Sequence, residues 1–455
     1  MSIEFNVAGI EFIAAVLLAA SVFFWLPGAR LRQAFWASGN LLVLWLVLPT
    51  SESLATWLAR HTAIHAATWL VLPNPASLAT LAVFLGSGYL VARLLQKRPS
   101  SWLLSSYIAL LVAAFVVLKQ YALLDWVLPR ALLQSPLRVL GLEIRDGVLQ
   151  HVVKIAGLSY MLFRQIHVLV DAAEGQIERL SLWSYVNYQV NLFTLLAGPI
   201  QRYQDFDEQW RKLQPVLADP HELLQNCLRL LLGVLKIALL APLFYKGWDE
   251  LQAGLVYRHV TGWKFIAEFP VVFYFYPLYL YLNFAGYCDI VIAASRFFGM
   301  KLPENFHRPW LARNVIEFWT RWHITLGTWI RDYLFMPMYK PVVERWPQRA
   351  QSLAWIFYFL AFAVAGAWHG TTLNFLCYGI WQGFGMSCTK LYENWLLARR
   401  GRAGLRTYLQ SPSIRLAAIV LNFHFQCLSM LIFSQRDVDD AWQIVRGLFL
   451  ALAGR

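Results

Sequence analysis

The stretch Glu317–Phe335 reads EFWTRWHITLGTWIRDYLF and holds four charged residues, three tryptophans and one histidine. At 100° per residue, a single helix over Ile316–Tyr333 places an aromatic and apolar stripe on one face, consisting of Phe318, Trp322, Leu326, Trp329 and Tyr333. His323 falls on a separate flank, away from the charged residues. Gly327 follows one turn later and is predicted to leave space over the His323 ring.

The charges in this stretch argue against a helix that faces lipid. Each charge at the centre of a bilayer costs about 2.5–3.5 kcal/mol, so four or five of them cost roughly 10–15 kcal/mol. Burying an aromatic side chain returns only about 1.5–3 kcal/mol. We therefore predict a re-entrant or interfacial helix that packs inside the protein.

The rest of the chain has the composition of a membrane protein. Of its 455 residues, 58% are hydrophobic and 14% are charged, whereas soluble domains carry about 25% charged residues. Apolar runs long enough to cross a bilayer recur along the sequence. The prediction is an all-α polytopic integral membrane protein in a lipid bilayer, with about 10–12 transmembrane helices and some re-entrant or interfacial helices. The predicted segments are Ala8–Leu26, Gln33–Leu48, Leu54–Leu72, Leu78–Leu95, Trp102–Leu118, Lys154–Val170, Trp183–Leu196, Leu223–Phe244, Phe265–Phe284, Ile290–Phe298, Ser352–Trp368, Leu373–Leu391 and Ile414–Phe433.

The net charge of +13 is attributed to loops rather than to a nucleic-acid interface. Lys and Arg collect on the cytoplasmic side of membrane proteins, so no nucleic-acid partner is predicted. The five cysteines lie in or beside apolar segments without zinc spacing. They are interpreted as small buried hydrophobic residues, and no metal site is predicted.

A second histidine lies in AGAWHGTTLNF, where His369 joins the predicted spans Ser352–Trp368 and Leu373–Leu391. Basic residues flank both outer ends of this pair, so the two spans are predicted to form a hairpin that enters from the cytoplasm and returns to it. His369 then lies deep in the membrane or near its far side, while His323 approaches from the cytoplasmic side. Gly366 and Gly370 are predicted to allow close approach of a ligand or of backbone.

Two histidines that meet inside a membrane protein are candidates for catalysis, because ionisable residues at membrane depth are functional by default. A buried neutral imidazole is a competent general base near pH 7. It could remove a hydroxyl proton as the oxygen attacks an acyl carbonyl. No serine or cysteine nucleophile motif lies nearby. An isolated histidine in a core is the plainer interpretation of each residue taken alone.

Six patches in order resemble the membrane-bound O-acyltransferase (MBOAT) family. They are similar to its bacterial branch, which includes proteins of alginate O-acetylation and of teichoic acid D-alanyl transfer. The resemblance runs from about Lys154 to Leu450, so we divide the chain into N-terminal transmembrane helices, residues 1–150, and an MBOAT core, residues 151–455. The patches are GLSYMLFRQIHVLVD, LLAGPIQRYQDF, FAGYCDIVIAASRFFGMKLPENFHRPW, EFWTRWHITLGTWIRDYLFMP, GAWHGTTLNFLCYGIWQG and FSQRDVDDAWQIVRGLF.

The resemblance implies roles for both histidines. His369 in WHG matches the catalytic histidine of the family, and His323 in RWH matches its second functional position. It also implies a bacterial inner-membrane location, helices around a thin centre, and an acyl thioester donor from the cytoplasm, either acetyl-CoA or an acyl carrier protein. No tightly bound cofactor is expected. The acceptor would be an extracytoplasmic polysaccharide, reached directly or through a periplasmic or membrane partner acyltransferase. The run FMPMYKPVVERWP departs from the alginate-type pattern and is somewhat closer to the D-alanyl branch.

The residues predicted to bind donor or substrate surround the two histidines. Asn305 and Arg308 in PENFHRPW could position a donor phosphate, or the motif could instead be a turn whose polar residues satisfy backbone. Tyr287 and Asp289 in AGYCDI could line the cavity, or Asp289 could instead pair with an arginine at membrane depth such as Arg296, seven residues later; the pairing is the preferred interpretation. Tryptophans near the histidines are predicted to exclude water from the thioester. The full predicted set is Trp322, Arg321, Trp368, Asn305, Arg308, Gly327 and Gly370.

Two alternatives to an O-acetyltransferase are retained. One keeps the fold and changes the donor to D-alanyl or to a longer acyl group on a carrier protein. The other is a transporter or channel for a lipid-linked sugar or a small anion, which the basic balance and the re-entrant segment would also suit. A transporter does not need two histidines with neighbouring glycines.

Overall fold

The computed structural model describes residues 10–47, 75–119, 157–214, 219–257 and 260–454. Within these ranges the chain is helical and forms no strand, as predicted. It divides into two compact units, residues 1–227 with 291–303 and residues 228–290 with 304–455. The predicted span Leu54–Leu72 and the predicted domain boundary at residue 150 lie outside the described residues.

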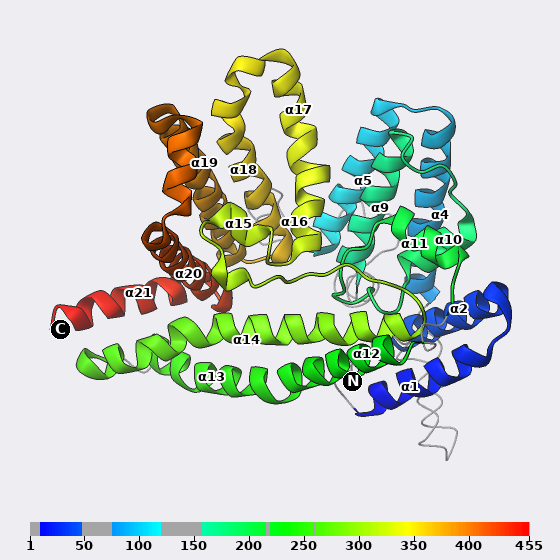
Figure 1. Ribbon diagram of the computed structural model, residues 1–455, viewed down its shortest axis with the longest axis horizontal. Coiled ribbons are helices and arrows are strands. Elements are labelled where there is room, and N and C mark those ends of the chain that lie inside the picture. Colours follow the sequence, from blue (N-terminus) through cyan, green and yellow to red (C-terminus); the bar gives the residue numbers. More distant parts are fainter. Residues whose placement is uncertain (1–9, 48–74, 120–156, 215–218, 258–259, 455) are drawn as a thin grey trace, which may run out of the picture. The chain divides into compact units, whose positions relative to one another are not determined.

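Among the described residues, the first unit is built of helices joined by polar loops (Figure 1). The predicted span Trp183–Leu196 is wrong, because α10 ends after eight residues. The buried guanidinium of Arg164 takes the carbonyl oxygens of Tyr188 (3.0 Å) and Gln189 (2.7 Å), which a continuing helix would need for its own ladder. The helices are α1 (Ile10–Trp25), α2 (Gly28–Val47), α4 (Pro75–Lys97), α5 (Ser101–Lys119), α9 (Leu158–Ala173), α10 (Leu182–Gln189) and α11 (Tyr203–Arg211).

A buried histidine of α9 fixes the loop before α11. Nε2 of His167 accepts a hydrogen bond from the backbone N–H of Tyr203 at 2.8 Å, and its Nδ1 lies 3.3 Å from the carboxylate of Asp171. Gln204 donates to the same carboxylate at 2.6 Å. The ring therefore holds the chain in GPIQRYQDF and has a structural role.

Two long helices, α12 and α14, contribute residues to both units. The predicted spans Phe265–Phe284 and Ile290–Phe298 are one continuous helix, α14 (Gly262–Phe297), of 36 residues with Pro270 and Pro277 inside it. The short apolar segment is its last turns. The chain before it forms α12 (Pro220–Leu235), the π-helical turn η2 (Lys236–Leu240) and α13 (Ala241–Tyr257).

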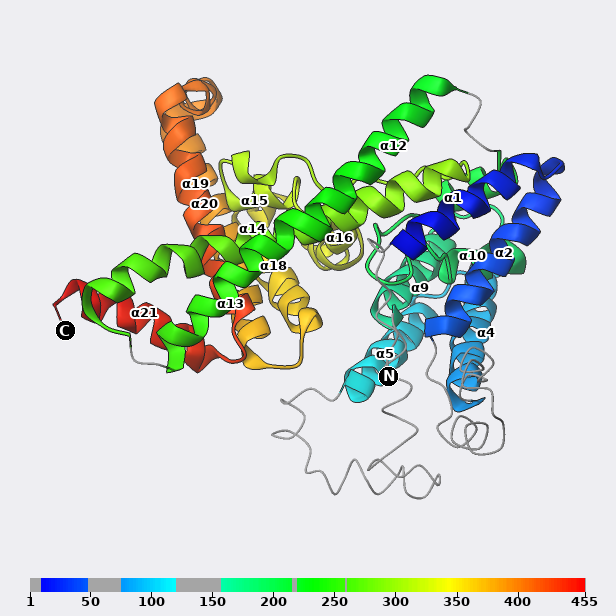
Figure 2. The ribbon, with the colours of Figure 1, turned by 90° about the horizontal axis from the view of Figure 1, so that it is seen from below.

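Side chains of four helices make the apolar core of the second unit. One buried cluster contains Trp248 of α13, Phe273 of α14, Leu431 of α20 and Ile444 of α21. Figure 2 shows α21 beside α13. The remaining elements of this unit are η3 (Pro309–Leu311), α15 (Val315–Trp319), α16 (Ile324–Ile330), η4 (Arg331–Phe335), α17 (Met336–Arg345), α18 (Pro347–His369), α19 (Leu373–Gln410), α20 (Pro412–Ser434) and α21 (Val438–Leu452).

The predicted hairpin is confirmed by α18 and α19, which run side by side (Figure 1). Their backbones touch along a seam of glycines. A Cβ atom on Gly366 would lie 2.6 Å from the carbonyl oxygen of Phe375, and one on Gly383 would lie 2.8 Å from that of Phe359. Small residues at such a seam let two helices approach closely in a membrane.

Five helical segments among the described residues are long and apolar enough to cross a membrane. Two shorter apolar helices, Glu11–Trp25 and Ser101–Val116, accompany them. The chain is a multi-pass membrane protein. The five segments are Leu78–Lys97, Pro220–Tyr257, Gly262–Phe297, Pro347–His369 and Pro412–Ser434.

Candidate active site

The stretch around His323 is two helices and not one. Helix α15 ends at Trp319, the chain turns through residues 320–323, and α16 begins at Ile324. His323 has φ 44° and ψ 52°, a left-handed conformation that breaks the helix. The predicted single helix over Ile316–Tyr333 is therefore wrong. At this turn the chain pairs with the segment around Phe306, because Phe306 and Trp322 form an antiparallel bridge.

The predicted apolar stripe is nevertheless largely buried. Phe318, Trp322, Leu326 and Trp329 are all buried. The Trp322 ring stacks on Phe318 with centroids 5.5 Å apart and meets Phe306 edge-on at 5.1 Å. The burial of these rings therefore stabilises the interruption between α15 and α16.

His323 is 5% exposed and lies in an apolar setting. The Phe284 ring of α14 meets its imidazole edge-on, with centroids 4.8 Å apart and an interplanar angle of 88°. The ring atom Nε2 is buried and has no hydrogen-bond partner among the described residues. Burial, and to a smaller extent the nearby His369, lowers the pKa of His323 to about 3. His323 is therefore a neutral imidazole at pH 7.

His369 is the last residue of α18 and is half-buried. Three aromatic rings surround it: Trp368 at 4.8 Å, Phe433 of α20 at 5.5 Å and Tyr378 of α19 at 5.8 Å. The hairpin tip is tied to the end of α20, since Nδ2 of buried Asn374 donates to the carbonyl oxygen of Gln435 at 2.8 Å. Three elements thus fix the His369 ring.

The two predicted histidines lie within electrostatic range of each other in the second unit. They lie close enough for His369 to affect the pKa of His323 electrostatically. One is buried and the other is half-buried, so they have unequal access to solvent. Among the described residues, no group of three His, Cys, Asp or Glu side chains could hold a metal ion.

The glycines near the histidines lie against other parts of the protein, and the predicted close approach of backbone is found at Gly366. A Cβ atom on Gly327 would lie 2.8 Å from the carbonyl oxygen of Trp319, so this glycine allows α15 and α16 to approach. A Cβ atom on Gly370 would overlap the ring of Phe375. Gly370 therefore accommodates a side chain of its own hairpin.

The predicted polar residues divide into paired and exposed ones. Nη2 of Arg321 donates to Glu317 at 2.6 Å, and Nε of Arg313 donates to the same carboxylate at 2.8 Å. Arg308 is exposed, with a left-handed φ of 49°. Asn305 is fully buried, and its side chain bonds within the protein.

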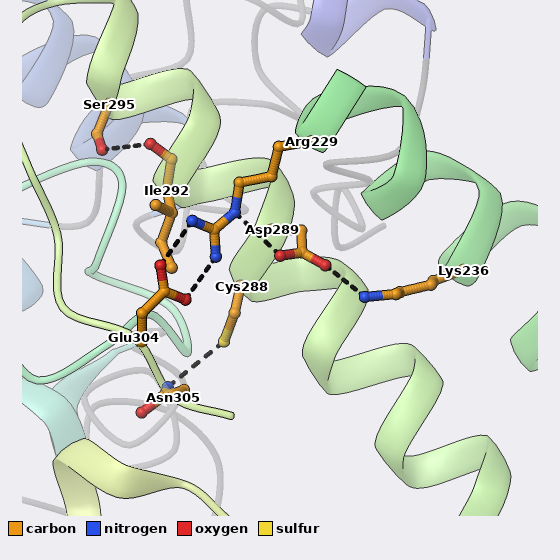
Figure 3. Close-up of polar contacts among 8 residues, drawn as sticks. All are labelled: Arg229, Lys236, Cys288, Asp289, Ile292, Ser295, Glu304 and Asn305. Carbon is orange, nitrogen blue, oxygen red and sulfur yellow. Dashed lines mark hydrogen bonds and ion pairs between the residues drawn. The ribbon is translucent and has the colours of Figure 1, made fainter. Parts of the chain in front are cut away.

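The predicted pairing of Asp289 with Arg296 is wrong. Asp289 accepts from Nε of Arg229 at 3.0 Å and from Nζ of Lys236 at 2.6 Å (Figure 3). Arg296 instead bonds Glu222 at 3.0 Å. The α12 and α14 backbones touch beside this cluster, where a Cβ atom on Gly233 would lie 2.8 Å from the Gly286 carbonyl oxygen. That crossing brings both cations to Asp289.

A cavity of about 230 Å³ lies along α16. Gly327 and Thr328 line it from α16, Phe362 lines it from α18, and exposed Thr320 and Arg331 also belong to its wall. Most of its lining is apolar. Ile324, the residue after His323 in the sequence, also lines the cavity.

Sequence reasoning missed a buried polar network that holds α15 in place. Nε1 of Trp319 donates to Gln382 of α19 at 3.0 Å, and Gln382 donates to Gln426 (2.7 Å) and Ser429 (2.8 Å) of α20. Both glutamines are fully buried. The signal was present in the sequence, because each glutamine interrupts an apolar run.

Comparison with known proteins agrees with this architecture. The model of the MBOAT, membrane-bound O-acyltransferase family matches residues 99–435. A teichoic acid D-alanyltransferase of Bacillus subtilis is 29% identical over 308 residues, which cover 62% of this chain and 69% of the relative. A probable alginate O-acetylase of Azotobacter vinelandii is 26% identical over 307 residues, 67% of this chain and 56% of the relative. The probable alginate O-acetylase of Pseudomonas aeruginosa is 25% identical over 303 residues, which cover 66% of this chain and 53% of the relative. The chain belongs to the membrane-bound O-acyltransferase family.

Proposed function

We propose that this O-acyltransferase moves an acetyl group from a cytoplasmic thioester donor to hydroxyl groups of an extracytoplasmic polysaccharide. The donor is acetyl-CoA or an acetylated carrier protein. The enzyme lies in the bacterial inner membrane and acts directly on the polymer or through a partner acyltransferase. The observation that carries the proposal is a buried imidazole, His323, within electrostatic range of a half-buried one, His369.

His369 is the general base in this proposal. At the hairpin tip the residue as a whole is more exposed than His323, although its Nε2 atom is buried. The hydroxyl oxygen forms a bond to the thioester carbonyl carbon while its proton passes to the His369 imidazole. The carbon–sulfur bond then breaks, and the leaving thiolate takes up that proton. Atoms and charge balance without a covalent enzyme intermediate.

His323 stabilises the carbonyl oxygen during the same step. Its buried Nε2 makes no hydrogen bond within the described protein. In the tautomer that carries a proton on Nε2, it can donate to the developing oxyanion, where a fixed donor in a dry site is most effective. The low pKa of the ring supports a neutral donor rather than an imidazolium.

The cavity along α16 supports a thioester donor. It has room for part of a narrow flexible arm, and its wall includes Ile324, the neighbour of His323 in the sequence. Exposed Arg331 in the same wall could meet a donor phosphate. Trp319 lines the same cavity and, with buried Trp322 and Trp329, limits water near a thioester.

The lining of the cavity favours acetyl over D-alanyl as the transferred group. None of the described residues that line it is acidic, and its one charged member is Arg331. A D-alanyl thioester carries an ammonium group, which would need a carboxylate or other acceptor in a low-dielectric site. An acetyl group has no such requirement.

The test compares cells that express wild-type protein, His369→Ala and His323→Ala at equal levels. Mass spectrometry and NMR of the exopolysaccharide would measure O-acyl content and identify the acyl group. We expect an acetyl ester with wild type, a loss of 10²- to 10⁴-fold with His369→Ala and about 10²- to 10³-fold with His323→Ala. Unchanged acylation in both variants contradicts the catalytic assignment of the two histidines. A D-alanyl ester on the polymer would show that the donor carries D-alanine and not acetate.

A transport function is distinguished by the same strains. A transporter would move its solute in the His369→Ala strain as it does in wild type, with no acyl transfer detected in either. Purified protein incubated with radiolabelled acetyl thioester and acceptor polymer gives the direct measurement.

A further inference from the structure

Asn305 directs its hydrogen bonds at the two residues that follow His323. Its backbone oxygen accepts from the N–H of Ile324 at 3.0 Å. Its side-chain Oδ1 accepts from the N–H of Thr325 at 3.2 Å and from the Thr325 hydroxyl at 2.7 Å. Its Nδ2 lies 3.4 Å from Sγ of Cys288 (Figure 3). The side chain is fully buried, and both its amide oxygen and its nitrogen have partners within the protein.

These bonds replace the cap that α16 lacks. The first N–H groups of a helix have no partner in the helix, and a side chain at the N-cap position commonly accepts from one of them. The N-cap of α16 is His323, which makes no side-chain cap bond. Asn305, 18 residues earlier in the sequence, supplies the acceptors instead. The His323 imidazole therefore does not serve as the side-chain cap of α16.

The segment that carries Asn305 is itself held on both sides. Before it, Arg229 donates two hydrogen bonds of 2.6 Å to Glu304 (Figure 3). After it, Phe306 pairs with Trp322, and the N–H of His307 donates to the carbonyl oxygen of Arg321 at 2.9 Å. The acceptors that meet α16 are therefore fixed in position before any substrate binds.

We propose that Asn305 is the positioning residue for His323. It holds the backbone of residue 323 in the left-handed region and relieves the imidazole of capping α16, so that Nε2 faces the acyl-transfer site. Nothing in this role requires Asn305 to touch the donor. The inference rests on the proposed acyltransferase function of the two histidines, and it adds a residue that acts through one of them.

The kinetic test compares purified Asn305→Ala and Asn305→Asp with wild type. The alanine variant loses the Oδ1 acceptor, and we expect kcat to fall about 10²-fold, the loss associated with a misplacement of roughly 1 Å. The KM for the acetyl donor should change less than about threefold. The aspartate variant keeps an oxygen at the Oδ1 position and should recover most of the kcat.

Asn422→Ala is the matched control. Asn422 is also buried in the second unit, where its Nδ2 donates to the carbonyl oxygen of Ala312 at 3.1 Å. A kcat for Asn305→Ala no lower than that of Asn422→Ala overturns the inference. A rise in donor KM with unchanged kcat also overturns it, because it would make Asn305 a donor-binding residue.

A second readout does not depend on activity. Diethyl pyrocarbonate modifies neutral imidazoles, and mass spectrometry of the peptide that contains His323 measures the rate. Buried and held by its backbone, His323 should react slowly in wild type and several-fold faster in Asn305→Ala, with no change in Asn422→Ala. Equal rates in all three proteins contradict a positioning role, whatever the activity of wild type.

The two readouts separate the inference from the proposed function. If wild type transfers no acyl group but the modification rates differ as expected, the positioning role stands and the acyl-transfer proposal fails. If Asn305→Ala does not fold, Thr325→Val carries the test, because it removes the hydroxyl bond and keeps the backbone bond. Thr325→Val should show an intermediate loss of kcat. The proposal is contradicted if this variant has both the kcat and the His323 reactivity of wild type.

Discussion

Gly366 of α18 and Gly379 of α19 face each other with no side chain between the two backbones. A Cβ atom on Gly379 would lie 2.7 Å from the Cα of Gly366 and 2.9 Å from its nitrogen. His369 lies one turn beyond Gly366 at the end of the same helix. The contact between the two glycines thus sets the position of the hairpin tip that carries His369.

Adding a methyl group to this seam should destabilise the protein. We expect Gly366→Ala or Gly379→Ala to cost about 1–3 kcal/mol, because backbone cannot move aside as a side chain would. Thermal unfolding in detergent measures the effect. Gly86→Ala is the control, since a Cβ atom there meets nothing within 4 Å. A melting temperature for Gly366→Ala as high as for Gly86→Ala would show that the helices do not pack as described.

At position 323 the usual preference for alanine over glycine in helices should be reversed. A left-handed residue other than glycine costs roughly 1–2 kcal/mol, so His323→Gly should be about 1 kcal/mol more stable than His323→Ala. Both variants lose the same imidazole, and the comparison therefore isolates the backbone. Melting temperatures of the two purified proteins provide the measurement. A more stable alanine variant would mean that residue 323 is not left-handed.

The buried imidazole should make stability depend on pH. The pKa of His323 is about 3 in the folded protein and about 6.5 in the unfolded chain. Below pH 6.5 the unfolded chain takes up a proton that the folded protein does not, so the free energy of unfolding falls as pH falls. Between pH 7.5 and pH 5 the loss amounts to about 2 kcal/mol, at 1.36 kcal/mol per pH unit below 6.5.

The comparison of wild type with His323→Asn tests this dependence. The asparagine variant should lose less stability between pH 7.5 and pH 5 than wild type does. His221→Asn removes an exposed imidazole and should keep the wild-type slope. Identical slopes for wild type and His323→Asn would place a protonated or exposed imidazole at position 323.

The charge cluster on α12 and α14 should tolerate the loss of Glu304 better than the loss of Asp289. The side chain of Asp289 is 17% exposed and serves two cations, whereas that of Glu304 is 56% exposed. Removing one partner of a buried pair costs about 3–5 kcal/mol, and an exposed pair contributes about 0–1 kcal/mol. Asp289→Asn should approach the lower end of the first range, and Glu304→Gln should stay within the second.

A double variant checks the cause. Lys236→Met in the Asp289→Asn background removes one of the two cations that the carboxylate neutralised, and it should recover part of the lost stability. No recovery in thermal unfolding would indicate that Asp289 acts through something other than charge pairing.

The sequence predicted the elements whose signal is local. The α18–α19 hairpin followed from two apolar runs with basic flanks, and the burial of Phe318 and Trp322 followed from helical spacing. The sequence pattern gave wrong predictions where a group distant in the sequence bonds to a helix. Arg164 takes the carbonyl groups that would have extended α10 into a span. Asp289 pairs with Arg229 of α12 and Lys236 of η2, more than 50 positions away, and no spacing rule indicates such a pair.

By itself, the sequence determined that the chain spans a membrane through helices and that His323 and His369 are its candidate catalytic pair, because hydropathy and charge act over short stretches. Only the tertiary structure decided the left-handed backbone of His323, the capping of α16 by Asn305, and the glutamine network behind Trp319. Each of these depends on hydrogen bonds between groups far apart in the sequence. A buried polar group must find its partner wherever the fold provides one.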